Sequence, residues 1–341
     1  MPENIKNYNP SAPGLKGTIF GLPHGKEEAE VVVYPVPWEA TVSYNSGTAF
    51  GPRAILDASV QLGLDLPHRD SPWKRGIWMS PMDGKIKSKS DILRTQIEPY
   101  IASLTTGQTY NNSVELLEKV NKSTDSLRQR IKQETLALIQ EGKYVGVLGG
   151  DHSCALGFVE ALAETHQDFG VLQIDAHMDL REAYEGFQHS HASVMFNVMK
   201  LKEVTQLVQV GIRDFCEEEL GYVHQNENRI TVFYDQVIKQ RKFEGVHWKT
   251  VCEQIIAKLP PKVYVSFDIG GLNPLLCPGT GAPVPGGLDY SEAVYLLQQV
   301  KASGRQIIGF DLCEVAPQPY DQQWNANVGA RVLYQLCGLV G

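Results

Sequence analysis

The chain has 341 residues, of which 43% are hydrophobic and 21% are charged, and this composition excludes a disordered or low-complexity protein. Its 31 Lys and Arg residues against 39 Asp and Glu residues give a formal net charge of −8. No basic run is long enough to follow a phosphate backbone, so we expect no nucleic-acid partner. No apolar stretch approaches the roughly 18 residues that a membrane-spanning helix needs, so we expect no membrane partner.

Residues 1–29 are polar and rich in Gly and Pro, which predicts an irregular N-terminal arm. In residues 30–341, short β-branched runs alternate with longer segments of helical period, a pattern typical of βα units around a mostly parallel sheet. No repeat or flexible linker interrupts this pattern, so we predict a single α/β domain. The candidate strands are residues 30–34, 144–148, 170–174, 207–210, 262–267 and 305–310.

The helical signals are clearest in two places. Gly51-Pro-Arg53 opens a helix, because proline in the first turn loses no hydrogen bond. Apolar residues from Leu116 to Ile139 recur at helical spacing and predict a long amphipathic helix. Residues 65–107 are the least periodic part, and there we predict only a strand around residues 77–79.

Several candidate strands end in acidic or imidazole side chains. In chain order, these are Asp151 and His152, then Asp175, His177 and Asp179, then Asp268, and finally Asp311 and Glu314. The carboxyl ends of parallel strands share one edge of the sheet, where ligands bind. We therefore expect these residues to converge.

A group of buried carboxylates needs a cation, because each unpaired buried charge costs several kcal/mol. Asp175, His177 and Asp179 alternate, so in an extended segment all three project from one side. Aspartate and histidine ligands without a thiolate fit a fairly hard ion such as Mn²⁺ better than structural zinc.

The motifs and their order resemble those of the ureohydrolase family, the arginases and agmatinases. The resemblance extends from about Val31 to near the C-terminus. The motifs are Gly149-Gly-Asp-His-Ser153, Asp175-Ala-His-Met-Asp179, Ser266-Phe-Asp268, Pro278-Gly-Thr-Gly281 with Pro285-Gly-Gly287, Phe310-Asp-Leu-Cys-Glu314 and, upstream, Gly47-Thr-Ala-Phe-Gly-Pro-Arg53.

This resemblance implies a three-layer α/β/α fold that holds two Mn²⁺ ions joined by a hydroxide. By the resemblance, His152 and Asp179 bind the first metal, His177 binds the second, and Asp175 and Asp268 bridge the two. Glu314 matches the carboxylate that binds the substrate's guanidinium. His191 matches a histidine that shuttles protons at the mouth of the site. A histidine with a pKa near 6.5 suits protonation of the leaving amine.

One family motif is incomplete in this chain. The family normally has further aspartates two and five residues after the bridging Asp268, at positions that Gly270 and Asn273 occupy here. The second metal therefore loses a ligand. Because even the loss of a partner that only supports a ligand costs about 10- to 100-fold in metal affinity, we expect one firmly bound Mn²⁺ and a second that is weak or absent.

The sequence thus favours a hydrolase that releases urea and an amine from a small guanidino compound, weakened by Gly270 and Asn273. Two alternatives remain open: a catalytically silent relative that acts as a binding or assembly subunit, and a formimidoylglutamase-type enzyme. The resemblance is closer to the agmatinase branch and also suggests a homo-oligomer. In the loop 181–190, Arg181 could meet a carboxylate on the substrate tail, whereas Glu182 or Glu185 could meet an ammonium group.

Cysteine chemistry is a further alternative. The six cysteines are scattered without a CxxC pair, which argues against a disulfide framework. The N-terminus also lacks the features of a secretory signal, so we expect the cytoplasm. Cys154 and Cys313 lie next to site residues and could act as nucleophiles, although free cysteines in such positions are usually small buried hydrophobes. His189 is a second candidate for the role of His191.

Overall fold

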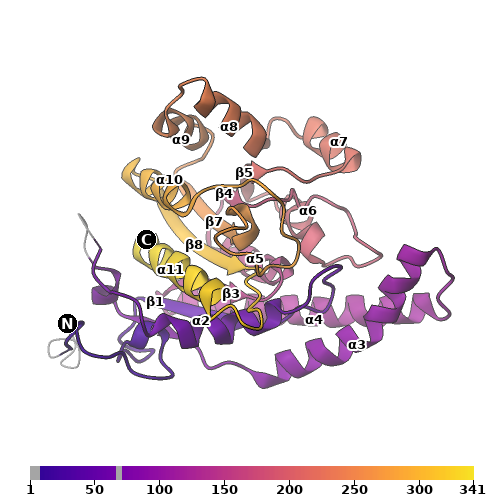
Figure 1. Ribbon diagram of the computed structural model, residues 1–341, viewed down its shortest axis with the longest axis horizontal. Helices are drawn as coiled ribbons and strands as arrows, with labels where there is room; N and C mark the ends of the chain where they lie inside the picture. Colours follow the sequence, from indigo (N-terminus) through magenta and orange to yellow (C-terminus); the bar gives the residue numbers. More distant parts are fainter. Residues whose placement is uncertain (1–7, 67–70) are drawn as a thin grey trace.

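A computed structural model describes residues 8–66 and 71–341. All eight strands in these residues form one parallel sheet, in the order β2-β1-β3-β8-β7-β4-β5-β6 (Figure 1). The strands are β1 (Val31–Val36), β2 (Ile77–Met79), β3 (Tyr144–Gly149), β4 (Phe169–Ile174), β5 (Val204–Ile212), β6 (Ile230–Tyr234), β7 (Lys262–Asp268) and β8 (Gln306–Cys313). The predicted α/β class with a parallel sheet is therefore confirmed.

Helices cover both faces of the sheet, which gives the three-layer arrangement that the resemblance implied. The helices are α2 (Gly51–Ser59), α3 (Gly84–Thr106), α4 (Ser113–Gln140), α5 (Leu156–Thr165), α6 (Val194–Val198), α7 (Glu217–Gln225), α8 (Asp235–Phe243), α9 (Trp248–Ile256), α10 (Tyr290–Ala302) and α11 (Trp324–Leu339). Helices α2, α8, α9, α10 and α11 contribute to the core on one face. Helices α3 to α7 contribute to the core on the other.

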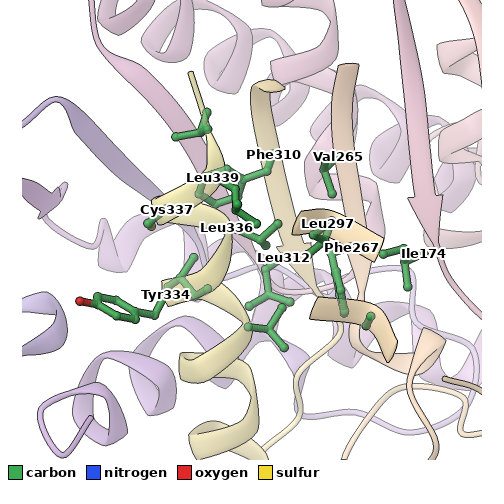
Figure 2. Packing of buried hydrophobic residues seen from close by; sticks show 14 of the residues in the cluster. Ile174, Val265, Phe267, Leu297, Phe310, Leu312, Tyr334, Leu336, Cys337 and Leu339 are labelled. Atoms are coloured by element: carbon green, nitrogen blue, oxygen red, sulfur yellow. The ribbon is translucent and has the colours of Figure 1, made fainter. Parts of the chain in front are cut away.

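The central strands are mostly apolar because both faces of the sheet are covered there. Val31 and Val33 of β1 pack into one core, whereas Val32 packs into the other. In the first core, Phe310 and Leu312 of β8 lie beside residues of α11 (Figure 2). This alternation follows from the two-residue period of a strand.

Residues 84–140, whose first part carried no predicted helix, form two long helices that run side by side (Figure 1). Helix α4 matches the predicted amphipathic stretch. Helix α3 went unpredicted because its sequence is mostly polar and contains Pro99. The part of the chain that the structure describes contains no helix long and apolar enough to cross a membrane.

The described part of the N-terminal arm packs against the domain. Ile19–Gly21 form a short 3₁₀ turn, and all three residues are buried. The Phe20 ring meets the ring of Tyr334 on α11 edge-on, with the centroids 4.8 Å apart. Residues 19–22 of the arm therefore contribute apolar side chains to the core.

Candidate metal centre

Four neighbouring strands bring the predicted site residues to one edge of the sheet. His152 follows β3, Glu314 follows β8, Asp268 ends β7 and Asp175 follows β4, and these strands are adjacent in the order β3-β8-β7-β4. Chain order and spatial order differ here, because β3 and β4 are separated by β8 and β7. A crevice at the carboxyl ends of strands, where their order reverses, is the usual ligand site of an open α/β sheet.

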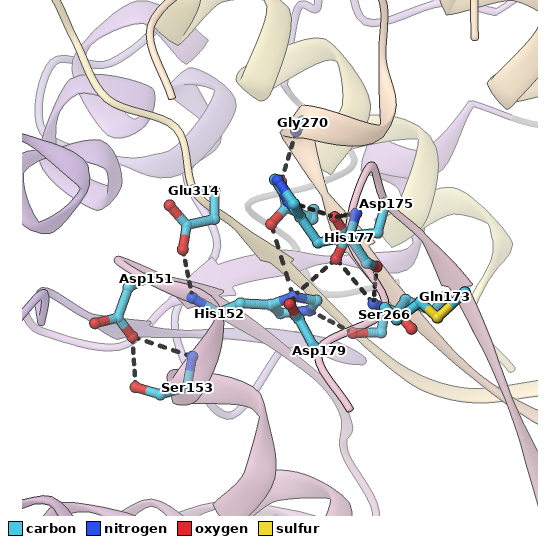
Figure 3. A network of polar contacts seen from close by, with 12 residues as sticks. Asp151, His152, Ser153, Gln173, Asp175, His177, Asp179, Ser266, Gly270 and Glu314 are labelled. Atoms are coloured by element: carbon cyan, nitrogen blue, oxygen red, sulfur yellow. Dashed lines mark hydrogen bonds and ion pairs between the residues drawn. The ribbon is translucent and has the colours of Figure 1, made fainter. Parts of the chain in front are cut away.

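The ring of His152 stands at the centre of a buried polar cluster (Figure 3). Its Nδ1 atom lies 2.8 Å from Asp179 Oδ2, 3.2 Å from Asp175 Oδ2 and 3.6 Å from Asp268 Oδ2. On the opposite edge of the ring, Nε2 lies 2.8 Å from the hydroxyl of Ser266. Ser266 thus orients the ring so that Nδ1 faces the three carboxylates.

These carboxylates are too close together to ionise independently. Burial and repulsion by Asp175 raise the pKa of Asp179 to about 6 and that of Asp268 well above its ordinary value. Burial also opposes ionisation of Asp175, but hydrogen bonds with His152 and His177 outweigh it, so its pKa lies below the ordinary value. Such a cluster is stabilised by a cation.

The donor atoms fit a divalent ion. One ligand atom each from His152, Asp175 and Asp268 lies within 4.8 Å of the others, and all three residues are buried. A histidine nitrogen with carboxylate oxygens and no thiolate is the donor set of a fairly hard ion such as Mn²⁺. The residues present therefore fit one such ion.

The position expected for a second ion is less complete. His177 Nδ1 lies 3.6 Å from Asp175 Oδ1, but Gly270 contributes no ligand. A Cβ atom on Gly270 would lie 2.9 Å from Asp268 Oδ1, so a side chain there would begin beside the Asp268 carboxylate. Asn273 is occupied elsewhere, because its Oδ1 accepts the backbone N–H of Leu275 and the residue does not line the pocket. Neither residue therefore supplies a ligand at the position expected for a second ion.

A pocket of about 290 Å³ opens above this cluster, and Glu314 and His191 line it. Glu314 Oε1 accepts the backbone N–H of His152 at 2.9 Å. A Cβ on residue 281 would lie 2.6 Å from Oε2 of Glu314, so any larger residue there would displace the carboxylate. Burial and repulsion by Asp151 raise the pKa of Glu314 to about 8. The residue holds φ at 69°, a strained conformation of the kind that often marks functional sites.

His191 begins the 3₁₀ turn His191–Ser193 and meets Tyr184 edge-on. Its Nε2 lies 3.5 Å from the hydroxyl of Ser43. Burial and repulsion by the His177 and His152 rings lower the pKa of His191 to about 4, below the ordinary value that suited a proton shuttle. The imidazole is therefore neutral at pH 7, with one ring nitrogen protonated and the other able to accept a proton.

The remaining candidates do not line the pocket. His189 does not line it and lies 3.7 Å from Asp125 on α4. Burial raises the pKa values of the Cys154 and Cys313 thiols well above the ordinary value, which argues against a thiolate nucleophile. Asp151 accepts the backbone N–H of Ser153, so it caps the turn that carries His152.

Two acidic residues of the pocket were absent from the sequence prediction. Asp214 and Glu219 line the pocket, whereas Glu182 and Glu185 do not. Both new residues follow β5, which runs two residues beyond the predicted end at Val210. If the predicted strand had ended at Ile212, Asp214 would have followed a strand end and would have been a candidate site residue.

Comparisons with known proteins show the family to which the chain is related. Residues 29–338 match the model of the arginase family. The N(1)-aminopropylagmatine ureohydrolase of Synechocystis is 31% identical over 85% of this chain and 82% of its own length. The guanidinobutyrase of Pseudomonas aeruginosa is 29% identical over 95% of this chain and 92% of its own length.

Solved structures agree in fold. The agmatine ureohydrolase of Thermoplasma volcanium superimposes with a TM-score of 0.70 at 21% identity, covering 93% of this chain and 91% of the other. The family match spans almost the whole sheet and all the strand ends that carry the site. This chain therefore belongs to the arginase family.

Proposed function

We propose that this protein is a metal-dependent hydrolase that converts a guanidino compound into urea and an amine. The observation that carries the proposal is the convergence of His152 Nδ1 with three carboxylates beneath a pocket that Glu314 also lines. A guanidinium is planar, cationic and a poor electrophile. Its hydrolysis needs both an activated nucleophile and a fixed orientation.

Mn²⁺ is the ion that we propose for this site, held by His152, Asp175, Asp179 and Asp268. When bound, such an ion makes water acidic enough to act as a nucleophile at neutral pH. A second ion would have His177 and the two bridging carboxylates as ligands, but no carboxylate from Gly270. We therefore propose one firmly bound ion and a second that is weak or absent.

Glu314 is the proposed anchor of the substrate. Its buried carboxylate can accept paired N–H bonds from a planar guanidinium. The raised pKa of Glu314, about 8, reflects burial and repulsion by Asp151. An incoming guanidinium adds a positive charge beside the carboxylate, so substrate binding favours its ionised form. The substrate carbon is then fixed above the metal ligands.

His191 is the proposed proton carrier. Its neutral ring lines the same pocket as Glu314, beside the hydroxyl of Ser43. A neutral imidazole can accept a proton and pass it to the leaving amine when the C–N bond breaks. Ser43 and Tyr184 keep the ring directed towards the pocket.

Gly270 favours a second candidate, a catalytically silent family member that binds guanidino compounds without turnover. Elemental analysis combined with a urea-release assay distinguishes the two. The purified chain should bind Mn²⁺ and release urea from agmatine, arginine or guanidinobutyrate, with Glu314→Gln losing most of the rate but keeping the metal. Bound metal and substrate without any urea would support the silent alternative.

We also propose that residues 30–341 act as one domain and that the chain forms a homo-oligomer. Several large apolar side chains are exposed in the single chain and are available for burial between copies. These are Phe50, Leu275, Tyr320 and Trp324. Sedimentation velocity should give a mass of at least twice that of the chain, whereas a monomer would contradict the proposal.

The cysteines support a reducing compartment, and we propose the cytoplasm. All six lie in described residues, none is paired, and five are buried. Thiol titration of protein purified without reductant should find six free thiols after denaturation. A disulfide would argue against this location.

A further inference from the structure

An arginine of α3 lies behind the wall of the pocket, although it does not line the pocket itself. The side chain of Arg94 is only 13% exposed, and its Nε lies 3.3 Å from Oε1 of Glu98, which is 56% exposed. A pair of charges one helical turn apart forms readily on an exposed surface, so this pair does not explain the burial. Burying a charged group costs free energy unless its N–H groups are bonded. The other partner of Arg94 therefore indicates its role.

Arg94 connects α3 to residues 42–44, three consecutive residues that line the pocket and that we call the pocket segment. Its Nη1 donates to the backbone carbonyl of Val42. The next residue is Ser43, whose Oγ lies 3.5 Å from Nε2 of His191. Because the peptide unit is planar, fixing the Val42 carbonyl also fixes the N–H of Ser43 and the direction of the chain there. Arg94 therefore helps to set how Ser43 meets His191.

Other residues of α3 bind the chain on both sides of the imidazole. Ser90 Oγ accepts the backbone N–H of Glu39, shortly before the pocket segment, at 2.9 Å. Tyr100 Oη donates at 3.0 Å to the carbonyl of Glu185, in the loop that leads to His191. Ser90 lies one helical turn before the arginine and therefore on the same face of the helix. Helix α3 thus holds both of the chain segments that meet at the His191 ring.

The charge of Arg94 also acts on the residues around the proposed proton carrier. Burial raises the pKa of Glu185, and the Arg94 charge opposes this rise. Burial and the charges of His177, His152 and Arg94 lower the pKa of His191 to about 4. The guanidinium is therefore close enough to act electrostatically on both side chains from outside the pocket.

We propose that Arg94 is a positioning residue, which holds the pocket segment so that Ser43 keeps the His191 ring directed towards the leaving amine. This inference rests on the proposed function, which makes His191 the proton carrier. Arg94 does not line the pocket, so its effect passes through Ser43 and His191. A change at Arg94 should therefore alter turnover more than the binding of substrate or metal.

Urea release from agmatine by the Mn²⁺-loaded protein tests this role. Arg94→Met keeps most of the side-chain length but removes the N–H donors. Its kcat should fall by about tenfold, a part of the roughly 100-fold or larger contribution of a well-placed acid or base, while KM and Mn²⁺ content stay close to those of wild type. Arg94→Lys can still donate to Val42 and should recover most of the rate. Glu98→Gln is the matched control, because it removes the ion pair on α3 but leaves the bond to Val42, and its kcat should equal that of wild type.

A double-mutant cycle with His191→Asn distinguishes a positioning role from a merely structural one. If Arg94 acts through His191, Arg94→Met should lower kcat little in a chain that already lacks the imidazole, because the effects of residues that act together are not additive. Equal factors in the two backgrounds would overturn the proposal. So would a loss of kcat in Glu98→Gln as large as that in Arg94→Met, or a loss that appears in KM alone.

Two measurements without substrate separate this inference from the proposed function. The backbone amides of residues 42 and 45 are hydrogen-bonded, so hydrogen exchange in residues 42–45 reports how firmly the pocket segment is held. Arg94→Met should speed this exchange by about tenfold, as expected when a hydrogen bond to a charged group is lost. It should also speed the modification of His191 by diethylpyrocarbonate, whereas Glu98→Gln should leave both rates as in wild type.

If no variant releases urea, the proposed function fails, and these two rates still decide the placement of the segment. Faster rates confined to the segment and to His191 would support the inference, and unchanged rates would overturn it. Faster exchange throughout the chain would also overturn it, because the arginine would then stabilise the whole fold. Should Arg94→Met fail to fold, Arg94→Gln takes its place in each experiment.

Discussion

At position 270, the absence of a side chain reduces the number of ligands available to a metal ion. The backbone N–H of Gly270 donates to Asp268 Oδ1 at 2.5 Å, so the backbone itself holds the Asp268 carboxylate in place. The space around a Cβ at this position contains Asp268 Oδ1 at 2.9 Å and Thr280 Oγ1 at 3.9 Å. A side chain at position 270 therefore requires a shift of the Asp268 carboxylate.

Gly270→Asp should therefore raise the metal content of the purified protein towards two ions per chain. The new carboxylate would add a ligand beside Asp268 and His177, and one unit of negative charge. Elemental analysis after dialysis against Mn²⁺ measures the change. Asn273→Asp is the matched control and should leave the content as in wild type, because residue 273 does not line the pocket. An equal gain in both variants would contradict this account.

His24, which does not line the pocket of the metal centre, should make the folding stability depend on pH. Its Nδ1 accepts the backbone N–H of Ile77 at 3.1 Å, and burial lowers its pKa below the model-compound value of 6.5. The folded state therefore binds fewer protons than the unfolded state once the pH falls below the unfolded pKa. Stability present above about pH 6.5 is lost as the pH drops through the folded pKa.

Urea unfolding at pH 7 and pH 5 should thus show a larger loss of stability for wild type than for His24→Asn. Asparagine can keep the bond to Ile77 but does not titrate. His224→Asn is a suitable control, because His224 is an exposed residue on α7. If His24→Asn and wild type lose the same stability, His24 does not cause the dependence.

At the scale of elements, strand signals predicted most of the sheet, because fully buried parallel strands are continuous apolar runs. The exception was β6, Ile230–Tyr234, although its β-branched and aromatic residues are a strand signal. The end of β5 was also missed, because Gly211 interrupts its apolar run. The site residues that follow β3, β4, β7 and β8 could be predicted because the carboxyl ends of parallel strands lie at one edge of the sheet. Asp214 and Glu219 required the true end of β5 and the packing of α7.

Helices α3 and α4 support the loop that carries Tyr184 and His191. Tyr100 of α3 donates to Glu185 O at 3.0 Å. Asn121 of α4 donates to Gly186 O at 3.2 Å and accepts the backbone N–H of Gln188 at 2.9 Å. A helix pair that sequence patterns only half predicted thus holds one wall of the pocket.

Asn121→Ala should loosen this loop without unfolding the domain. It removes two hydrogen bonds, each contributing about 0.5–1.5 kcal/mol, so amide exchange in residues 184–191 should become faster by about tenfold or more. Hydrogen exchange followed by mass spectrometry measures the effect. Gln129→Ala removes a side-chain bond to Asp125 on the same helix and should leave exchange in the loop unchanged. Faster exchange throughout the chain would instead indicate global destabilisation.

At the scale of the whole molecule, folding brings several carboxylates together in one buried cluster. The chain has a formal net charge of −8, and the carboxylates of Asp175, Asp179 and Asp268 are brought together in the interior. The unfolded chain keeps these groups apart and solvated. The large apolar cores on the two faces of the sheet must therefore offset the electrostatic cost when no cation is bound.

A ligand that binds only the folded state stabilises it by mass action. Mn²⁺ at about 100 times its dissociation constant should contribute about 2.7 kcal/mol, and at roughly 2.1 cal/mol/K per residue of unfolding entropy this raises Tm by about 4 °C. Differential scanning calorimetry in EDTA and in Mn²⁺ measures the shift. Asp179→Asn should raise Tm in EDTA, because it removes repulsion, and should shrink the gain from Mn²⁺, because it removes a ligand. An undiminished gain in this variant would mean that the ion stabilises the fold from another place, and the carboxylates around His152 would then need a different explanation.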